Sequence, residues 1–465
     1  MRFRASEIAE AVGGSLVGPD VEVDGVTIDS RGVTGGELFV PVVAGRDGHD
    51  FVGDAMAAGA SAYLTARRRL GPGATAIEVA DTSAALLALG RHARLHLPDR
   101  AIGITGSVGK TSVKDLTAAA LGSRYRVAAS ERSFNNELGV PLTLANAPAD
   151  TECVVVEMGA RGRGHITVLC EVARPTIGVV TVVAAAHTEL FGSVANVASA
   201  KAELVEALPL QGTAVLNADD ERVVAMRRAT EAAVLTFSAS GDARADVVAD
   251  HVRLDDQLRP AFVIRSPWGR VEVALAVHGG HNVTNALAAT AAAVAAGATL
   301  EEAAAGLAHA RLAPHRMELT RTSSGLLVLD DSYNANPTST EAALRSLAQL
   351  PARRRVAVLG LMAELGPEGP QEHRRIGRLA RSLGIEVVAV DVGHYGPEAV
   401  SGVEGAFSAL EALGPLGGGD AVLVKASRVA GLDRLSSMLL SAGAGDPPGQ
   451  RSGALSGEGP AAMPR

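Results

Sequence analysis

Residues 101–112 read AIGITGSVGKTS. The apolar run Ala101–Thr105 predicts a buried strand, and the residues from Lys110 onward predict a helix. The turn between them is rich in glycine, so consecutive backbone N–H groups can point inward around phosphate oxygens at the positive end of the helix. We therefore predict a phosphate-binding loop within an α/β fold. Lys110 would reach the terminal phosphates, and Thr111 would offer its hydroxyl to Mg²⁺.

The loop departs from the strict pattern G-x-x-x-x-G-K-[ST], because Ile104 stands where the first glycine belongs. A tight turn that contains Gly-Lys-Thr without binding phosphate is the alternative. The strand before the loop and the helix after it favour phosphate binding. The nucleotide-binding residues predicted in the loop are Gly106, Ser107, Gly109, Lys110, Thr111 and Ser112.

Strands and helices alternate on the C-terminal side of this loop, which predicts a parallel, doubly wound sheet. We expect an α/β protein of three domains. These are a small α/β N-terminal domain at 1–82, a central P-loop-type domain at 83–315 and a smaller Rossmann-like domain at 316–442. Residues 443–465 are rich in Gly, Pro and Ser without periodicity, which predicts a disordered tail.

Hydrophobic periodicity and turn residues give the expected elements. The expected strands are Val21–Ile28, Glu37–Pro41, Ser61–Leu64, Ala101–Thr105, Cys153–Val156, Ile177–Val183, Ala214–Asn217, Leu326–Asp330, Arg355–Leu359, Glu386–Val390 and Ala421–Lys425. The expected helices are Val52–Ala58, Ser83–Leu95, Asn282–Ala310, Ser339–Gln349, Gln371–Leu383 and Leu432–Leu440.

Composition excludes several classes of protein. The balance of 43 basic and 51 acidic residues gives a net charge of −8, which argues against non-specific nucleic-acid binding. The most apolar runs, Ile177–Ala186 and Ala286–Ala298, are too short or too rich in Ala and Gly to span a bilayer, so we expect no membrane insertion. The start lacks the apolar core of a signal peptide, so we expect a cytoplasmic protein. Cys153 and Cys170, both in strand-like stretches, are interpreted as buried thiols.

Lysine occurs only at Lys110, Lys114, Lys201 and Lys425, while arginine supplies every other fixed positive charge. Coding bias toward arginine accounts for the scarcity but not for these positions. Lysine is a compact charge whose amine can lose its proton and react, which arginine cannot do. Each remaining lysine is therefore a candidate for such chemistry.

Glu157 and His187 each follow an apolar strand. Residues just beyond the carboxyl ends of parallel strands meet at the ligand crevice, so both are expected near Lys110 and Thr111. A carboxylate suits Mg²⁺, whereas an imidazole is an unusual Mg²⁺ ligand. For His187 alone, a hydrogen-bonded structural histidine is the simpler interpretation.

The loop TGSVGKT (residues 105–111) resembles the ATP loop of the Mur ligase family, which also lacks the first glycine. EMGA (157–160), AHTELFGS (186–193) and AKAE (200–203) resemble the successive central-domain motifs of that family. The resemblance covers about residues 20 to 440. It implies an ATP-dependent amide-bond ligase that uses ATP and Mg²⁺.

The resemblance also implies roles for individual residues. Thr111 and Glu157 would hold one Mg²⁺, and His187 would hold a second. Lys201 would be carbamylated by CO₂ and help to bind the second metal; a surface lysine on a helix is the alternative. GHNVTN (280–285) resembles the adenine-contacting motif, which implicates Asn282 and Asn285, although Asn282 could simply cap a helix. Arg316 would touch ATP phosphates, and Asp331 the ribose.

DSYNANP (331–337) resembles the signature of the family branch that adds D-alanyl-D-alanine. The substrates implied are UDP-N-acetylmuramoyl-tripeptide and D-alanyl-D-alanine, joined through an acyl phosphate by a monomeric enzyme. The stretches NNELGVP (135–141), LGLMAELG (359–366) and VKASR (424–428) agree, although Leu361, Ala426 and Thr181 depart from the common residues. The predicted substrate-binding residues are Ser30, Arg31, Asn135, Asn136, Asn334, Asn336, Lys425 and Ser427.

Two other functions stay open on the sequence alone. A sister Mur ligase or a folylpoly-γ-glutamate synthetase would share the ATP loop but not the signature at 331–337. A nucleotide-binding regulator on the same fold would be expected to have lost catalytic positions, whereas Lys110, Glu157, His187 and Lys201 are all present.

Overall fold

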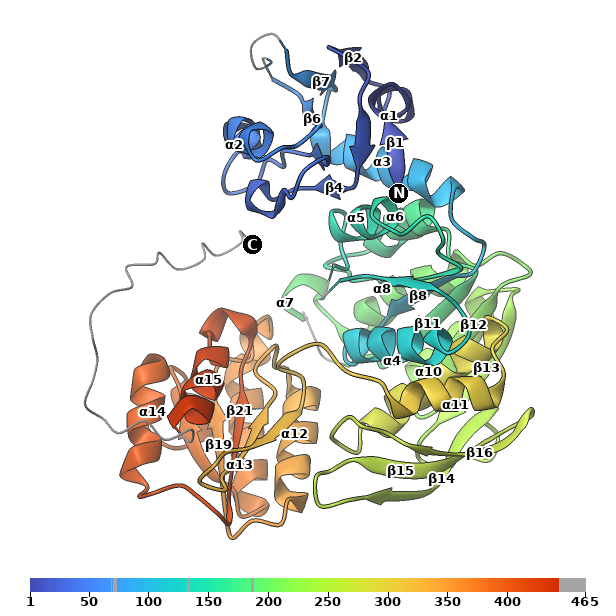
Figure 1. Cartoon of the computed structure of the whole chain (residues 1–465). Coiled ribbons are helices and arrows are strands. Elements are labelled where there is room, and N and C mark those ends of the chain that lie inside the picture. Colours follow the sequence, from blue (N-terminus) through green and yellow to red (C-terminus); the bar gives the residue numbers. More distant parts are fainter. Residues whose placement is uncertain (68, 70–72, 132–133, 185–187, 443–465) are drawn as a thin grey trace.

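The computed structural model describes residues 1–67, 69, 73–131, 134–184 and 188–442. The chain forms three successive sheet-centred modules, coloured blue, cyan to yellow, and orange to red in Figure 1. The predicted α/β fold class is confirmed. The exact domain boundaries stay a prediction, and the tail at 443–465 lies outside the described residues.

The N-terminal module contains a mixed sheet and a two-stranded sheet. The mixed sheet has the order β2 (Ser15–Val17), β7 (Thr75–Glu78), β6 (Ala62–Thr65), β5 (Leu38–Phe39) and β4 (Val26–Thr27), and the small sheet pairs β1 (Arg2–Arg4) with β3 (Glu22–Asp24). Its helices are α1 (Ala5–Ala11) and α2 (Val52–Ala57), with 3₁₀ turns at Ser30–Gly32 and Gly48–Phe51. The strand expected at 21–28 is split, because Gly25 adopts a φ of +94° between β3 and β4.

The central module is built on a nine-stranded sheet. Its order is β16 (Gly269–Ala274), β15 (Pro260–Ser266), β14 (Val247–Leu254), β13 (Ala233–Ser238), β12 (Thr213–Asn217), β11 (Ile177–Val180), β8 (Ala101–Thr105), β10 (Cys153–Glu157) and β9 (Val127–Ala129). The strands from β9 to β14 are parallel, whereas β14, β15 and β16 pair antiparallel. The sequence did not predict this antiparallel extension.

Helices cover both faces of the central sheet. One apolar core lies under α4 (Lys110–Gly122), α10 (Asn282–Ala295) and α11 (Leu300–Ala308). The other lies under α3 (Thr82–Leu95), α5 (Gly139–Ala145), α6 (His165–Ala173) and α8 (Val194–Glu206). The shorter helices are α7 (Thr188–Phe191), α9 (Glu221–Ala225) and a 3₁₀ turn at Met226–Ala229.

The C-terminal module is a second, smaller layered α/β unit. Its sheet has the order β17 (Glu318–Arg321), β18 (Leu327–Asp330), β21 (Asp420–Lys425), β19 (Arg354–Leu359) and β20 (Glu386–Ala389), parallel except for β17. α12 (Pro337–Gln349) and α13 (Gly369–Ser382) pack on one face, and α14 (Gly402–Ala412) and α15 (Asp433–Ala442) on the other. Short 3₁₀ turns occur at Gly366–Glu368, Gly393–Tyr395 and Arg428–Ala430.

Three sequence expectations are corrected. Cys170 lies on helix α6 and not on a strand; both cysteines are nevertheless buried, and burial raises the pKa of each thiol to about 12. The single helix expected at 282–310 is two helices, because Gly297 turns the chain with a φ of +96°. The strand expected at 177–183 ends at Val180. Within the described part of the chain, no helix is long and apolar enough to cross a bilayer.

Candidate active site

The glycine-rich loop follows the carboxyl end of the central strand β8 and leads directly into α4. Gly106 and Gly109 have φ angles of +145° and +85°, which favour glycine. A Cβ at Gly106 would lie 2.0 Å from the Thr181 hydroxyl, and one at Gly109 would lie 2.8 Å from the Asn285 side-chain oxygen. The loop therefore needs glycine at both positions, as the sequence predicted.

Thr181 fixes the shape of this loop from the neighbouring chain segment after β11. Its hydroxyl donates a hydrogen bond to the Val108 carbonyl at 2.6 Å. Its backbone N–H donates to the Thr105 carbonyl at 3.0 Å. Thr181 is a departure from the common family residue, and its hydroxyl still makes a contact that holds the loop.

Thr111 and Glu157 meet at the carboxyl edge of the sheet. Glu157 is the last residue of β10, which pairs with β8, so its side chain reaches the start of α4. The Thr111 hydroxyl donates to the Glu157 carboxylate at 2.6 Å, and the Asn135 amide donates to the other carboxylate oxygen at 2.7 Å. Thr111 and Glu157 are 3% and 1% exposed. The part of the predicted convergence that concerns Glu157 is therefore present.

Arg316 joins this cluster from the segment that precedes the C-terminal sheet. Its guanidinium donates to the Thr111 hydroxyl at 2.9 Å and lies 4.2 Å from the ring centroid of Tyr333. A planar guanidinium over an aromatic face is held by cation–π attraction. Arg316 thus connects the phosphate loop to the segment after β18.

These residues surround a cavity of about 370 Å³ between the central and C-terminal modules. Its walls combine the phosphate loop with polar side chains from both the central and the C-terminal module. The polar lining residues are Ser107, Lys110, Thr111, Ser112, Asn135, Glu157, His281, Thr284, Asn285, Arg316, Asp331, Tyr333, Asn334, Asn336, Thr338, Ser339 and Lys425.

Two buried nitrogen atoms of this cavity have no hydrogen-bond partner among the described residues. They are Nε of Arg316 and Nδ1 of His281. Burial lowers the pKa of His281, which favours its neutral imidazole. Buried polar atoms are normally paired, so unpaired ones in a polar cavity indicate groups that a ligand completes.

Lys110 and Lys201 place two amines near one carboxylate. The Lys110 ammonium donates to the Gly106 carbonyl at 2.8 Å. Burial lowers the pKa of Lys110, and the charge of Glu157 partly opposes this shift. Lys201, on α8, is 2% exposed; burial and then the charge of Lys110 lower its pKa to about 7. A fraction of Lys201 is therefore a neutral amine near neutral pH.

Several predicted residues make contacts that build the site. Asp331 pairs with Lys425, whose ammonium also donates to the Asn334 carbonyl at 2.8 Å. The Asn336 side chain caps α12. Ser427 is almost completely buried, and its hydroxyl accepts from the backbone N–H of Ala363.

Asparagine side chains at the starts of two helices, α5 and α10, also form hydrogen bonds within the chain. Asn136 accepts from the N–H groups of Leu138 and Gly139 ahead of α5. Asn282 is fully buried, and its amide donates to the His278 carbonyl and accepts from Asn285. Asn285 and His281, rather than Asn282, line the cavity. The resemblance implicated both Asn282 and Asn285, of which only Asn285 lines the cavity, and their contact with adenine stays a prediction.

Comparison with known proteins agrees with this geometry. Residues 104–293 match the family model described as the Mur ligase middle domain, and 315–428 match the Mur ligase glutamate ligase domain. The chain is 40% identical to the UDP-N-acetylmuramoyl-tripeptide–D-alanyl-D-alanine ligase of Mycobacterium tuberculosis H37Rv over 95% of this chain and 98% of that protein. It is 38% identical to the enzyme of the same name from Escherichia coli K12, over 88% of this chain and 90% of that protein.

The chain belongs to the Mur ligase family. Among solved structures, MurF from Acinetobacter baumannii superimposes with a TM-score of 0.86 at 28% identity, covering 95% of this chain and 99% of that one. MurF ligase from Thermotoga maritima in complex with ADP superimposes with a TM-score of 0.78 at 25% identity, covering 90% and 97%.

Other predicted residues of this Mur ligase lie away from the cavity or cannot be placed. Ser30 and Arg31 form a 3₁₀ turn in the N-terminal module, where Arg31 pairs with Asp29 at 2.8 Å. They are not among the residues that line the cavity. His187 lies outside the described residues, so its predicted metal role stays a prediction.

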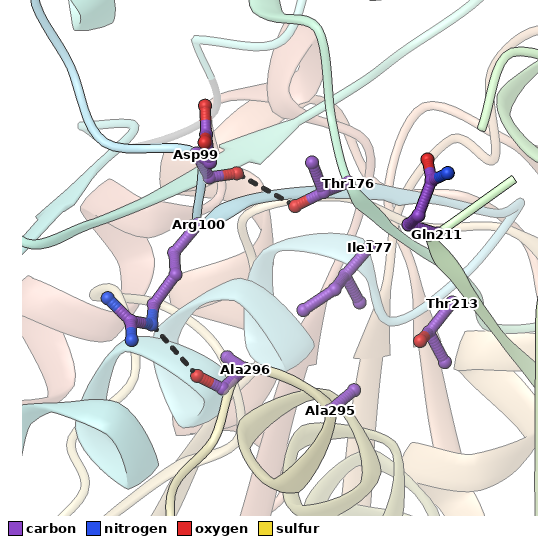
Figure 2. A pocket seen from close by; sticks show the side chains of 8 residues that line it. All are labelled: Asp99, Arg100, Thr176, Ile177, Gln211, Thr213, Ala295 and Ala296. Carbon is purple, nitrogen blue, oxygen red and sulfur yellow. Dashed lines mark hydrogen bonds between the residues drawn. The ribbon is translucent and has the colours of Figure 1, made fainter. Parts of the chain in front are cut away.

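This Mur ligase has a second cavity, of about 480 Å³, at the opposite end of the central sheet (Figure 2). It lies where β8, β11 and β12 begin, whereas open parallel sheets bind ligands where strands end. The Thr176 hydroxyl donates to the Asp99 carbonyl at 2.8 Å, and Arg100 donates to the Ala296 carbonyl at 3.1 Å. The cavity at the phosphate loop is therefore the better candidate for the active site.

Removal of the Lys110 charge should slow the reaction with ATP. Lys110→Ala should lower the rate of ATP turnover about 100- to 1000-fold, the usual cost of losing one group that stabilises charge in a transition state. Arg124→Ala, which removes an exposed cation just beyond the other end of α4, should leave the rate unchanged. Phosphate release measures both variants. Undiminished turnover in Lys110→Ala would contradict the phosphate-loop assignment.

Proposed function

We propose that this chain joins D-alanyl-D-alanine to UDP-N-acetylmuramoyl-tripeptide, with hydrolysis of ATP to ADP and phosphate. The observation that carries the proposal is the shared cavity. Its walls combine the phosphate loop of the central module with Asp331, Tyr333 and Asn334 of the signature segment. The proposal is supported by relatives of that name at 38–40% identity and by a structural relative in complex with ADP.

An amide does not form spontaneously from a carboxylate and an ammonium group in water, so the carboxylate must first be activated. In the proposed reaction, the terminal carboxylate of the tripeptide attacks the γ-phosphorus of ATP, and ADP leaves. The neutral amine of the dipeptide then attacks the acyl carbon. Phosphate departs with the carboxylate oxygen that formed the new P–O bond, and the amine loses a proton.

The chain contributes charge and position to the phosphoryl transfer. The Lys110 ammonium and the loop N–H groups would stabilise the charge on the γ-phosphoryl oxygens. Arg316 lines the cavity and is held against Tyr333, and its buried Nε–H has no partner among the described residues; its guanidinium would contact a second phosphate oxygen. Closure of the two modules around the bound substrates would keep water from the acyl phosphate.

The oxygen atoms at the cavity edge fit a magnesium ion. The Thr111 hydroxyl and the Glu157 carboxylate lie 2.6 Å apart, and hard oxygen donors are the ligands that Mg²⁺ prefers. We propose that Thr111 and Glu157 hold one Mg²⁺, and that His187 and a carbamylated Lys201 serve a second. When bound, the metal would neutralise charge on the phosphates.

We assign one of the three substrates to each of the three domains. We assign the UDP-sugar to the domain at 1–82, with Ser30 and Arg31 near the nucleotide, and ATP to the domain at 83–315. The domain at 316–442 would hold the dipeptide, with Asn334, Asn336, Lys425 and Ser427 close by. We further propose that the chain acts as a monomer in the cytoplasm, where ATP is available.

A sister ligase is the main alternative. A folylpolyglutamate synthase structure from Mycobacterium tuberculosis superimposes on this chain with a TM-score of 0.62 at 19% identity. At that identity the two proteins share only the fold. A nucleotide-binding regulator is disfavoured, because Lys110, Thr111 and Glu157 are all present and line the same cavity.

The substrate assignment is tested by phosphate release with different amines. With ATP, Mg²⁺ and a UDP-N-acetylmuramoyl-tripeptide, D-alanyl-D-alanine should drive continuous phosphate release, and single amino acids should not. The sugar-nucleotide product should gain the mass of the dipeptide less one water. Turnover with glutamate or a diamino acid in place of the dipeptide would assign the chain to a sister activity.

Lys201 is predicted to act as a carbamate. Its neutral amine would add CO₂ and release a proton, so that a cation becomes an anion beside the proposed metal. With a pKa of about 7, the neutral fraction of the amine falls about tenfold for each pH unit below 7. Removal of CO₂ should therefore lower activity more strongly at pH values below 7 than above, and bicarbonate should restore it.

Two substitutions separate this role from that of an ordinary cation. Lys201→Ala should be folded but about 100-fold less active, and a short carboxylic acid in solution should partly restore it. Lys201→Arg keeps the positive charge but cannot carry a carbamate, so it should be equally impaired. Full activity in Lys201→Arg, or no response of the parent to CO₂ removal, would refute the carbamate.

A further inference from the structure

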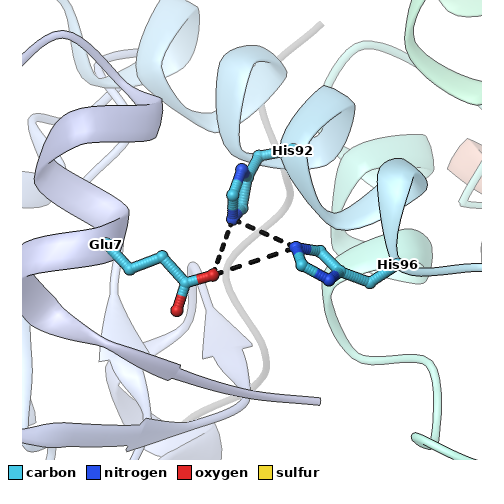
Figure 3. A group of neighbouring side chains, drawn as sticks. All are labelled: Glu7, His92 and His96. Atoms are coloured by element: carbon cyan, nitrogen blue, oxygen red, sulfur yellow. Dashed lines mark hydrogen bonds and ion pairs between the residues drawn. The ribbon is translucent and has the colours of Figure 1, made fainter.

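Outside the active site, three potential metal ligands converge where α1 meets α3. Glu7 lies on α1, His92 lies in the last turn of α3, and His96 is the C-cap residue of that helix, four residues further on, so both imidazoles lie at the same side of the helix end. Figure 3 shows the Glu7 carboxylate pointing between the two rings. The proposed ligase reaction uses none of these residues.

We propose that Glu7, His92 and His96 form a zinc site. The nearest Glu7 oxygen is 2.9 Å from His92 Nε2 and 3.8 Å from His96 Nε2, and the two Nε2 atoms are 3.4 Å apart. Tetrahedral Zn²⁺ with ligands at about 2.0–2.2 Å separates them by about 3.4 Å. The three distances average to that value, so one ion at the centre would reach all three atoms with small side-chain shifts.

A hydrogen bond between His92 and Glu7 satisfies only one edge of this triangle. If His92 Nε2 carries a proton and donates it to Glu7, it has no lone pair left to accept from His96 Nε2. If it carries no proton, its lone pair faces the carboxylate oxygen directly. A cation at the centre would satisfy the lone pairs of all three atoms.

The surroundings hold the ligands in this orientation. The second oxygen of Glu7 accepts from the Arg4 backbone N–H in a capping box at the start of α1. The Phe3 ring packs against both imidazoles, with centroid distances of 5.6 Å and 5.9 Å. Such outer contacts orient metal ligands. The His96 side chain is 49% exposed, so water can supply the fourth ligand.

The ligand set selects zinc over magnesium. Two imidazoles and one carboxylate suit Zn²⁺, whereas Mg²⁺ prefers oxygen ligands. The ion would tie α1 of the N-terminal module to α3, which packs against α5 and α6 of the central module. It would therefore strengthen the attachment of the first module to the second, without taking part in the reaction.

The test is zinc binding by the full-length chain without a polyhistidine tag. Equilibrium dialysis is done in millimolar Mg²⁺, which occupies the oxygen-rich site proposed at Glu157. The parent should bind one Zn²⁺ per chain at the triangle, and Co²⁺ in its place should give the strong visible absorption of tetrahedral coordination. Zinc should also raise the thermal unfolding midpoint by a few degrees, because it binds the folded chain.

Substitution of each ligand provides the control. His92→Ala, His96→Ala and Glu7→Gln should each weaken zinc binding by more than about tenfold and remove the thermal shift. His309→Ala, which removes an exposed histidine at the end of α11, should behave like the parent. In metal-free buffer, the Glu7→Gln midpoint should stay close to that of the parent, which excludes a folding defect. Zinc binding by the parent weaker than millimolar, or equal binding by the His92 and His96 variants, would overturn the proposal.

Discussion

The structure depends on one chain of hydrogen bonds at the end of the central sheet. The Arg316 guanidinium donates to the Thr111 hydroxyl, which donates to the Glu157 carboxylate. Thr111 follows the phosphate loop, Glu157 ends β10 and Arg316 begins the C-terminal unit, so three distant parts of the sequence are fixed against one another. A charged donor and an ionised acceptor at the two ends make these bonds stronger than neutral ones. The cavity between the modules is built around this chain.

Charge balance explains why lysine is retained at two positions of an arginine-rich protein. Burial and then the charge of Lys110 lower the pKa of Lys201, and the charges of Glu203 and Glu157 offset only part of this shift. The result is one amine at the phosphate loop and a second with a pKa of about 7. Arginine would keep its charge at both positions and would leave the repulsion unrelieved.

The sequence predicted the parts of the fold that follow local rules. The loop at 105–111 and its flanking strand and helix were located correctly, because glycine spacing and apolar runs are short-range signals. The antiparallel strands β14–β16 were missed, and Cys170 was placed on a strand. The apolar run around Cys170 fits a buried strand or a helix equally well, and its packing in the core decides between the two. Residue contacts such as Thr181 with Val108 join distant segments, so no local pattern indicates them.

In the proposed reaction, the phosphate loop activates a carboxylate by phosphoryl transfer. The most direct test is to supply the tripeptide substrate with isotopically heavy oxygen in its terminal carboxylate and to analyse the phosphate released during ligation. Each phosphate should carry one heavy oxygen, since the attacking carboxylate oxygen leaves with the phosphoryl group. Phosphate without the heavy isotope, in a reaction that still forms the amide, would contradict the acyl phosphate and with it the role assigned to the loop.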